Sequence, residues 1–311
     1  MKTFHSINSF HSSKKTIVTI GTFDGVHIGH NQILQKIVQD AKNCDCESLV
    51  LTFFPHPRMI LQDNTEVKLL NTIAEKSMLI KNIGIDNLII HPFDKEFSRL
   101  TAEEFVKTIL VEKFNIQKII IGYDHRFGRN RTADIDDLII FSKQFGFEVE
   151  QILAQQIDEI SVSSTKIRTA ILEGDITLAN NYLGYNYSFS GNVVKGKQLG
   201  RTIGFPTANI NIDEEYKLIP KNGVYIVKSI ISEKTIYGMM NIGTRPTVNG
   251  LNQTVEVFFI DFDSNLYEQK ITIEILDFIR EEQKFDSLDL LKNQIEIDKQ
   301  KTLQFIKNTT F

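Results

Sequence analysis

The sequence is poor in cysteine and has no long apolar run. Its 311 residues include two cysteines, Cys44 and Cys46, in a C-x-C spacing with no second pair elsewhere. This spacing favours two reduced thiols of an intracellular protein over a disulfide framework. No segment approaches the ~18 apolar residues of a membrane span, and the N-terminal residues MKTFHSINSFHSSKK contain no apolar signal region. We therefore expect a cytoplasmic protein without a membrane partner.

Excess positive charge is also missing. Asp and Glu number 39 against 35 Lys and Arg, for a formal net charge of -4. Broad nucleic-acid binding needs a basic face, so we expect no nucleic-acid partner, although a local basic pocket is compatible with this balance. What the chain has is 41% hydrophobic residues and enough length for two domains with sizeable cores.

Between residue 16 and about 183, short β-branched runs alternate with helical patterns. Thr101 and Glu104 have the spacing of a capping box, and Gly146 ends a second helical pattern. Continuous apolar runs are typical of parallel strands covered on both faces. This part therefore predicts a doubly wound, Rossmann-like parallel α/β sheet. Its expected strands are 16–20, 48–53, 87–91, 118–122 and 147–153.

After residue 184 the strand patterns follow one another without long helices. Several alternate apolar and polar residues, as TVEVF does at 254–258, and one helical pattern at 287–306 closes the chain. The pattern indicates a small antiparallel β-barrel followed by a C-terminal helix. We place the domains at 1–184 and 185–311. The expected barrel strands lie within 187–196, 207–212, 223–230, 234–243, 254–262 and 269–279.

The first expected strand runs into the decapeptide GTFDGVHIGH, residues 21–30. Gly21 and Gly25 allow a tight turn and close approach of a ligand, and a helix N-terminus that follows suits phosphate. His27 and His30 then lie three residues apart on one helical face, where imidazoles can donate to phosphate oxygens. The alternatives are two surface histidines or a zinc pair, and zinc would need a third ligand that has no obvious spacing.

This decapeptide resembles the signature of the nucleotidylyltransferase superfamily, in the form found in bacterial bifunctional riboflavin kinase/FAD synthetases. Three further segments are similar to that family: TFFPHPR (52–58), GYDHRFGRNRTAD (122–134) and SVSSTKIR (161–168). The four segments follow the first, second, fourth and fifth expected strands. Ligands of open α/β sheets bind at these strand ends.

The resemblance implies transfer of AMP from ATP to FMN in the N-terminal domain. His27, His30 and Arg168 would be catalytic and would contact the nucleotide, and Arg168 can form a forked contact with phosphate. The other implied nucleotide-binding residues are Gly21, Thr22, Phe23, Asp24, Gly25, Ser164 and Thr165, and the implied flavin-binding residues are His56, Pro57, Asp124 and Phe127.

Several of these residues have a simpler interpretation. Asp24 and His56 bind a ligand or only brace the loops, and Ser163 to Thr165 also fit a plain helix N-cap. His125 stands where the family usually has Phe, and Ala133 where it has Gly.

The C-terminal part contains a glycine-rich segment, GNVVKGKQLGRTIGFPTANI (191–210). It nearly matches a P-loop, but Gln198 replaces the hydroxyl residue and no helix is expected after it, so we reject a Walker A motif. Thr207 and Asn209 offer hard oxygen ligands for Mg²⁺, whereas composition alone fits a hairpin with a turn at Pro206. The segment resembles the P-T-A-N signature of riboflavin kinase, which implies nucleotide contacts at Gly196, Lys197, Gly204, Thr207 and Asn209, and metal ligation by the last two.

Phosphoryl transfer needs a group that orients or deprotonates the attacking hydroxyl, and Glu256 is the candidate. Its simpler interpretation is an exposed strand glutamate. The family's pattern places the base there, but Phe258, Asn265 and Glu268 replace its His, Asp and Gly. By the same resemblance, Arg280 and Phe285 contact the flavin or brace the last helix.

Together these features predict a bifunctional enzyme that uses ATP and Mg²⁺. Riboflavin would be phosphorylated to FMN with release of ADP, and FMN would be adenylylated to FAD with release of pyrophosphate. The alternatives are a chain with one active module, or a flavin- or nucleotide-binding sensor without turnover.

Overall fold

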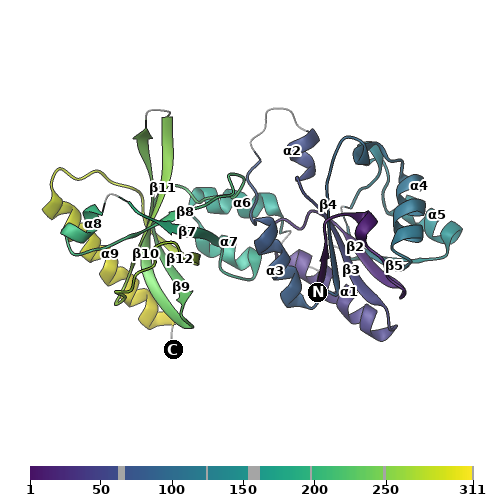
Figure 1. Ribbon diagram of the computed structural model, residues 1–311, viewed down its shortest axis with the longest axis horizontal. Coiled ribbons are helices and arrows are strands. Elements are labelled where there is room, and N and C mark those ends of the chain that lie inside the picture. Colours follow the sequence, from purple (N-terminus) through teal and green to yellow (C-terminus); the bar gives the residue numbers. More distant parts are fainter. Residues whose placement is uncertain (62–66, 124, 153–161, 197, 248–249, 310–311) are drawn as a thin grey trace. The chain divides into compact units, whose positions relative to one another are not determined.

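The computed structural model describes residues 1–61, 67–123, 125–152, 162–196, 198–247 and 250–309 (Figure 1). It separates into two compact units, Met1–Ser164 and Thr165–Phe311. We refer to these as the first and the second unit and describe each by itself.

A six-stranded parallel sheet, in the order β1-β4-β3-β2-β5-β6, forms the centre of the first unit. The five strands expected from the sequence are confirmed, whereas β1, only three residues long, was not foreseen. The strands are β1 (Lys2–Phe4), β2 (Thr16–Ile20), β3 (Glu47–Phe53), β4 (Asn87–His91), β5 (Ile116–Gly122) and β6 (Glu148–Ile152).

Both faces of this sheet are buried. Ile17 of β2 packs in one apolar cluster with Leu34 of α1, and its neighbour Val18 packs in the opposite cluster with Phe114. The capping box of Thr101 and Glu104 is present. These features confirm the doubly wound sheet. Its helices are α1 (Ile28–Asn43), α2 (Pro57–Leu61), α3 (Ile73–Ile83), α4 (Ala102–Glu104) with the π-helix η3 (Phe105–Lys113), and α5 (Ile135–Phe145), with short 3-10 turns η1 (Ile7–Ser9), η2 (Phe97–Arg99) and η4 (Arg129–Arg131).

The second unit contains a closed antiparallel barrel in the order β10-β11-β8-β7-β12-β9, and α9 (Leu288–Thr309) follows it. The expected barrel and closing helix are confirmed. The strands are β7 (Ser188–Val194), β8 (Ala208–Asn211), β9 (Gly223–Ile231), β10 (Lys234–Thr247), β11 (Gly250–Phe259) and β12 (Lys270–Arg280), and the other helices are α6 (Ser164–Glu173), α7 (Ile176–Leu183) and α8 (Leu199–Thr202).

Helix α7 is tied to the barrel through one side chain. The Asn180 amide nitrogen donates to the carbonyl of Ile275, 3.0 Å away, and its oxygen accepts from the backbone of Tyr187 at 2.7 Å. Residues before the predicted domain boundary therefore pack with the second unit.

The expectation of two reduced thiols is wrong, because Cys44 and Cys46 are joined by a disulfide bond. Asp45 between them is left-handed (φ 54°), and this turn brings their Cα atoms to 5.3 Å, within bridging range.

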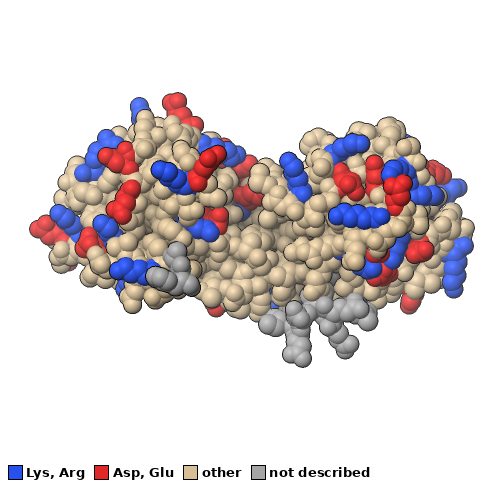
Figure 2. Space-filling view, turned by 90° about the horizontal axis from the view of Figure 1, so that it is seen from below, with Lys and Arg blue, Asp and Glu red and all other residues tan. Residues whose placement is uncertain are grey.

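Charged side chains of both signs are interspersed on each unit in the face that Figure 2 shows. No helix among the described residues is both long and apolar enough to span a bilayer.

Candidate active sites

The turn between β2 and α1 has an unusual backbone. Phe23 (φ 47°), Gly25 (φ 89°) and Val26 (φ 38°) are all left-handed. Only glycine adopts this region freely, and a β-branched valine is especially unfavourable in it. Backbone strain of this kind gathers at functional sites, where the surrounding structure holds it in place.

Asp24, at the centre of this turn, is 1% exposed. Its Oδ1 accepts hydrogen bonds from the backbone N–H groups of Leu70 (2.9 Å) and Asn71 (3.4 Å), and the Ser164 hydroxyl donates to its carbonyl at 2.8 Å. These contacts are those of a bracing residue. A nucleotide contact of Asp24 stays a prediction.

His27 and His30 lie together at the start of α1. His27 is the N-cap, its Nδ1 accepts from the His30 backbone N–H at 3.4 Å, and the two rings stack with centroids 3.7 Å apart. Among the described residues, the buried His30 Nδ1 has no hydrogen-bond partner. Burial lowers the pKa of His30 well below its ordinary value, and the charges of His27 and Lys76 lower it further. The ring is therefore neutral at pH 7 and can donate to an anion at the helix N-terminus.

Sequence reasoning missed Lys76, which lies on the buried side of α3 at 2% exposure. Its ammonium donates to the carbonyl of Thr22 at 2.7 Å, in the turn just described. The only signal in the sequence is a lysine between Ile73 and Ile80, at helical spacing in an otherwise apolar stripe.

The P-H-P loop forms the start of α2. His56 is buried, its Nδ1 accepts from the backbone of Arg58 at 3.1 Å, and Pro57 is the first residue of the helix. These contacts brace the loop, and flavin binding by His56 and Pro57 stays a prediction.

Phe127 and Ala133 close the loop after β5 with two backbone hydrogen bonds of 3.1 and 3.3 Å. Both side chains are buried, and Ala133 is not in a left-handed conformation, so alanine fits where the family has glycine. His125 stacks on the Phe127 ring with centroids 6.2 Å apart. Asp124 lies outside the described residues, and flavin binding by Phe127 stays a prediction.

The S-S-T-x-I-R segment lies at the division between the two units. Ser164 ends the first unit, while Thr165 and the partly exposed Arg168 stand on α6 in the second. Their roles toward a nucleotide stay predictions.

In the barrel, strand register brings three predicted residues together. Glu256 of β11 lies directly opposite Asn209 of β8, and the Thr207 hydroxyl donates to Glu256 Oε2 at 3.1 Å. All three side chains are partly buried. The cluster presents a carboxylate, a hydroxyl and a carboxamide, all of them hard oxygen donors of the kind that Mg²⁺ accepts.

Two flap glycines have a steric reason to be glycine. A Cβ at Gly196 would overlap the side chain of Asn209, and Gly204 is left-handed (φ 89°). Lys197 lies outside the described residues. The four-residue helix α8 lies between these two glycines, directly after Gln198, although no helix was expected there, and Gln198 still lacks the hydroxyl of a P-loop.

The three substituted positions of the barrel are accommodated locally. Phe258 packs edge-on against Phe205, with centroids 5.2 Å apart. Asn265 Oδ1 accepts from the backbone of Tyr267 at 3.0 Å, as an aspartate oxygen could. Glu268 is left-handed (φ 67°) at the position where the family has glycine.

Arg280 forms an ion pair with α9. Its guanidinium donates to both carboxylate oxygens of Asp298, which is 2% exposed, with a shortest distance of 2.8 Å, and lies 5.9 Å from the centre of the Phe285 ring. These are bracing contacts, and flavin contacts of Arg280 and Phe285 stay predictions.

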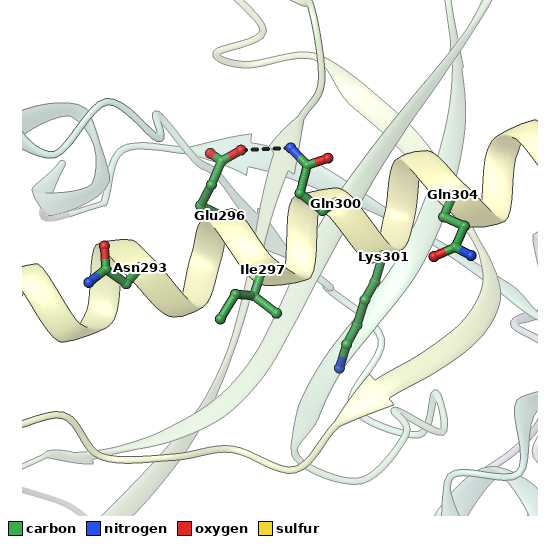
Figure 3. A pocket seen from close by; sticks show the side chains of 6 residues that line it. All are labelled: Asn293, Glu296, Ile297, Gln300, Lys301 and Gln304. Carbon is green, nitrogen blue, oxygen red and sulfur yellow. Dashed lines mark hydrogen bonds between the residues drawn. The ribbon is translucent and has the colours of Figure 1, made fainter.

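A shallow pocket lies along α9, and no predicted site residue lines it (Figure 3). Glu296 and Gln300 in its wall are hydrogen-bonded to each other at 2.9 Å. The lining residues are Asn293, Glu296, Ile297, Gln300, Lys301 and Gln304. Within the described part of the chain, no group of three or more His, Cys, Asp or Glu side chains is placed to hold a metal ion.

Comparison with known proteins gives two family matches in series, FAD synthetase over residues 9–166 and riboflavin kinase over 183–306. The bifunctional riboflavin kinase/FMN adenylyltransferase of Haemophilus influenzae is 38% identical over 94% of this chain and 96% of its own. That of Escherichia coli K12 is 36% identical over 93% and 92%. A solved structure described as a macrolide-efflux protein from Streptococcus pneumoniae is 30% identical, with a TM-score of 0.89 over 97% of this chain and 98% of that one.

Proposed function

We propose roles for the residues of the two units, starting from the fact that this chain belongs to the family of bifunctional riboflavin kinase/FMN adenylyltransferases. The chain is an enzyme of flavin cofactor biosynthesis that phosphorylates riboflavin to FMN and adenylylates FMN to FAD, with ATP as co-substrate in both steps. The single observation that carries this function is the match of both family models, one after the other, over most of the chain. The alternatives of one active module or of a sensor without turnover are not favoured.

In the kinase reaction we assign Glu256 as general base. Its carboxylate accepts the proton of the ribityl hydroxyl while that oxygen bonds to the γ-phosphorus of ATP, and the bond to the β–γ bridging oxygen breaks to release ADP. The hydrogen bond from Thr207 supports this role because it orients the carboxylate beside Asn209. The flap over the nucleotide would consist of Gly196, Lys197 and Gly204. The flavin would be contacted by Arg280 and Phe285.

Mg²⁺ is part of this proposal, with Thr207 and Asn209 as its ligands. The oxygen donors beside Glu256 fit a hard cation, and the ion would neutralise charge on the phosphates of ATP. The chain's own residues supply the base and its orientation.

In the adenylyl transfer, an FMN phosphate oxygen bonds to the α-phosphorus of ATP, and pyrophosphate leaves. His27 and His30 would donate hydrogen bonds to the phosphates as negative charge builds on them, together with Arg168. Gly21 to Gly25, Ser164 and Thr165 would hold the nucleotide, and His56, Pro57, Asp124 and Phe127 the flavin. The orphaned, buried Nδ1 of His30 supports this assignment.

We propose that the chemistry divides at 184/185 and that both steps take place in the cytoplasm. The location is supported by the dependence of both reactions on ATP. The boundary is tested with two fragments, 185–311 and 165–311. Because Asn180 binds the barrel backbone, we expect the longer fragment to unfold at higher urea, while both convert riboflavin to FMN. A folded but inactive 185–311 would contradict the boundary.

The proposal as a whole is tested by incubating the purified protein with riboflavin, ATP and Mg²⁺ and separating the flavins by chromatography. We expect FMN to appear first and FAD to follow, and omission of Mg²⁺ to stop the first step. FMN formation that is equally fast in a metal-chelating buffer would contradict the magnesium site.

A further inference from the structure

The turn after β2 needs to be held, because its backbone is unfavourable for the residues in it. Phe23 and Val26 are left-handed without being glycine. A turn of this kind relaxes unless neighbouring groups hold it. The two residues lie just before His27, so relaxation would move the stacked imidazoles.

Two buried side chains link this turn to the segment that begins α3, and they do so in opposite directions. The Asp24 carboxylate reaches out of the turn to the backbone N–H groups of Leu70 and Asn71. Lys76 reaches back from α3 to the carbonyl of Thr22, at 2.7 Å. The same carbonyl also accepts from the Thr52 hydroxyl at 3.2 Å, which fixes its direction.

If Lys76 served only to pack α3 against its neighbours, a buried ammonium would be an unfavourable group at this position. Lys76 is 2% exposed and shares the buried side of α3 with Ile80. Taking a charge out of water costs free energy, and buried ion pairs can often be replaced as a whole by apolar residues without loss of stability. Burial lowers the pKa of Lys76 to about 8, and Asp24 is the opposing negative charge. A buried cation beside the turn that we propose to bind the nucleotide therefore points to a role beyond packing.

We propose that Lys76 is a positioning residue for adenylyl transfer, which holds the strained turn after β2 so that His27 and His30 keep their stacked geometry. This inference rests on the proposed role of the two histidines. Lys76 acts through the Thr22 carbonyl and not by contact with substrate. Burial is the main cause of the lowered pKa of His30, and His27 and then the positive charge of Lys76 lower it further.

The test compares three variants of the full-length chain. Lys76→Met removes the ammonium and keeps the length of the side chain, and Lys76→Arg keeps a cationic donor. Lys81→Met is the control, because Lys81 is exposed on the same helix. Riboflavin phosphorylation in each preparation monitors the second unit, and thermal melting monitors folding.

We expect Lys76→Met to lower kcat for FMN adenylylation at least about tenfold, the scale of a small misplacement of catalytic groups, with less change in KM. Lys76→Arg should recover most of this loss, and Lys81→Met should match the wild type. A folded Lys76→Met protein with kcat within twofold of wild type would overturn the proposal. If this variant fails to fold, Lys76→Gln, a neutral donor, replaces it under the same criterion.

A second measurement separates positioning from simple stabilisation. In Lys76→Met, the pKa of His30 measured by NMR should rise, because the positive charge of Lys76 that lowers it is gone. An unchanged pKa would overturn the electrostatic part of the proposal. The variant His30→Ala tests the proposed role of His30 separately from that of Lys76. If this variant adenylylates FMN normally, the proposed role of His30 fails, whatever the result for Lys76.

Discussion

The two sites of this enzyme are built on opposite principles. In the first unit, the candidate groups follow a strained turn whose backbone is held by buried side chains, and the imidazoles stack at a helix start. In the barrel, Glu256 and Asn209 stand in regular strands, and their pairing alone places them side by side. The comparison teaches that a ladder of hydrogen bonds positions its own side chains, whereas a turn needs help from elsewhere in the chain.

This difference also explains where departures from the family pattern are tolerated. The decapeptide at 21–30 resembles the family signature, and a change there would alter a strained backbone. Phe258 and Asn265 in the barrel are accommodated by an aromatic neighbour and a local hydrogen bond. The strand pairing that places Glu256 does not depend on either side chain.

The largest expected effect tests the barrel side of the comparison. Glu256→Gln keeps the shape of the side chain and removes its basicity, so riboflavin kinase kcat should fall by roughly two to four decades. Adenylylation of supplied FMN should persist. Glu233→Gln, in the exposed turn between β9 and β10, is the control. Wild-type kinase turnover in folded Glu256→Gln would mean that this glutamate is only a strand residue.

The matching change in the first unit is His30→Ala. Loss of one preorganised donor should lower FMN adenylylation by about a hundredfold, while phosphorylation of riboflavin stays nearly unchanged. His11→Ala, an exposed histidine of the same unit, is the control. Equal loss of both activities would indicate misfolding, and unchanged adenylylation would remove His30 from the site.

A third prediction concerns the brace between the barrel and α9. Asp298→Ala leaves the Arg280 guanidinium without its carboxylate partner, so the free energy of unfolding of the second unit should fall by about 3 kcal/mol. Urea titration followed by kinase activity measures this loss, with the exposed Asp289→Ala on the same helix as control. If stability is unchanged but the KM for riboflavin rises, Arg280 serves the flavin and not the helix.

The smallest effect tests whether strain outside the first site has a function. Glu268 is left-handed (φ 67°), a conformation that glycine adopts without steric strain. Removal of the backbone strain should stabilise the fold by about 1–2 kcal/mol, and the greater flexibility of glycine in the unfolded chain should cost about 0.5–1 kcal/mol. The free energy of unfolding of Glu268→Gly should therefore rise slightly. Glu296→Gly within α9 should instead lower it by about 1 kcal/mol. A fall in kinase turnover of Glu268→Gly would show that this strain is functional.

The sequence predicts the architecture well because periodicity reports burial directly. The strands of both units and the strand–turn–helix setting of His27 and His30 follow from local pattern. β1 was missed because three residues carry no period. The contact of Thr207 with Glu256 was not predictable, since register depends on which strands pair across the barrel. Lys76 was missed because a single lysine in an apolar stripe has the same pattern as a lysine that reaches out to solvent.

The closed barrel has a consequence for which unit aggregates first on heating. Apart from the ribbon in which β10 and β11 extend past their pairing with β9 and β8, the barrel has no free strand edge among the described residues. The described sheet of the first unit instead ends at two whole strands, β1 and β6, whose outer backbone groups can template another chain. Pairing of these two edges with another chain is made less favourable, since β1 has only three residues and β6 carries Glu148 and Glu150. When heat loosens the structure, intermolecular β-pairing, and with it aggregation, should therefore begin in the first unit, and riboflavin phosphorylation should outlast adenylylation.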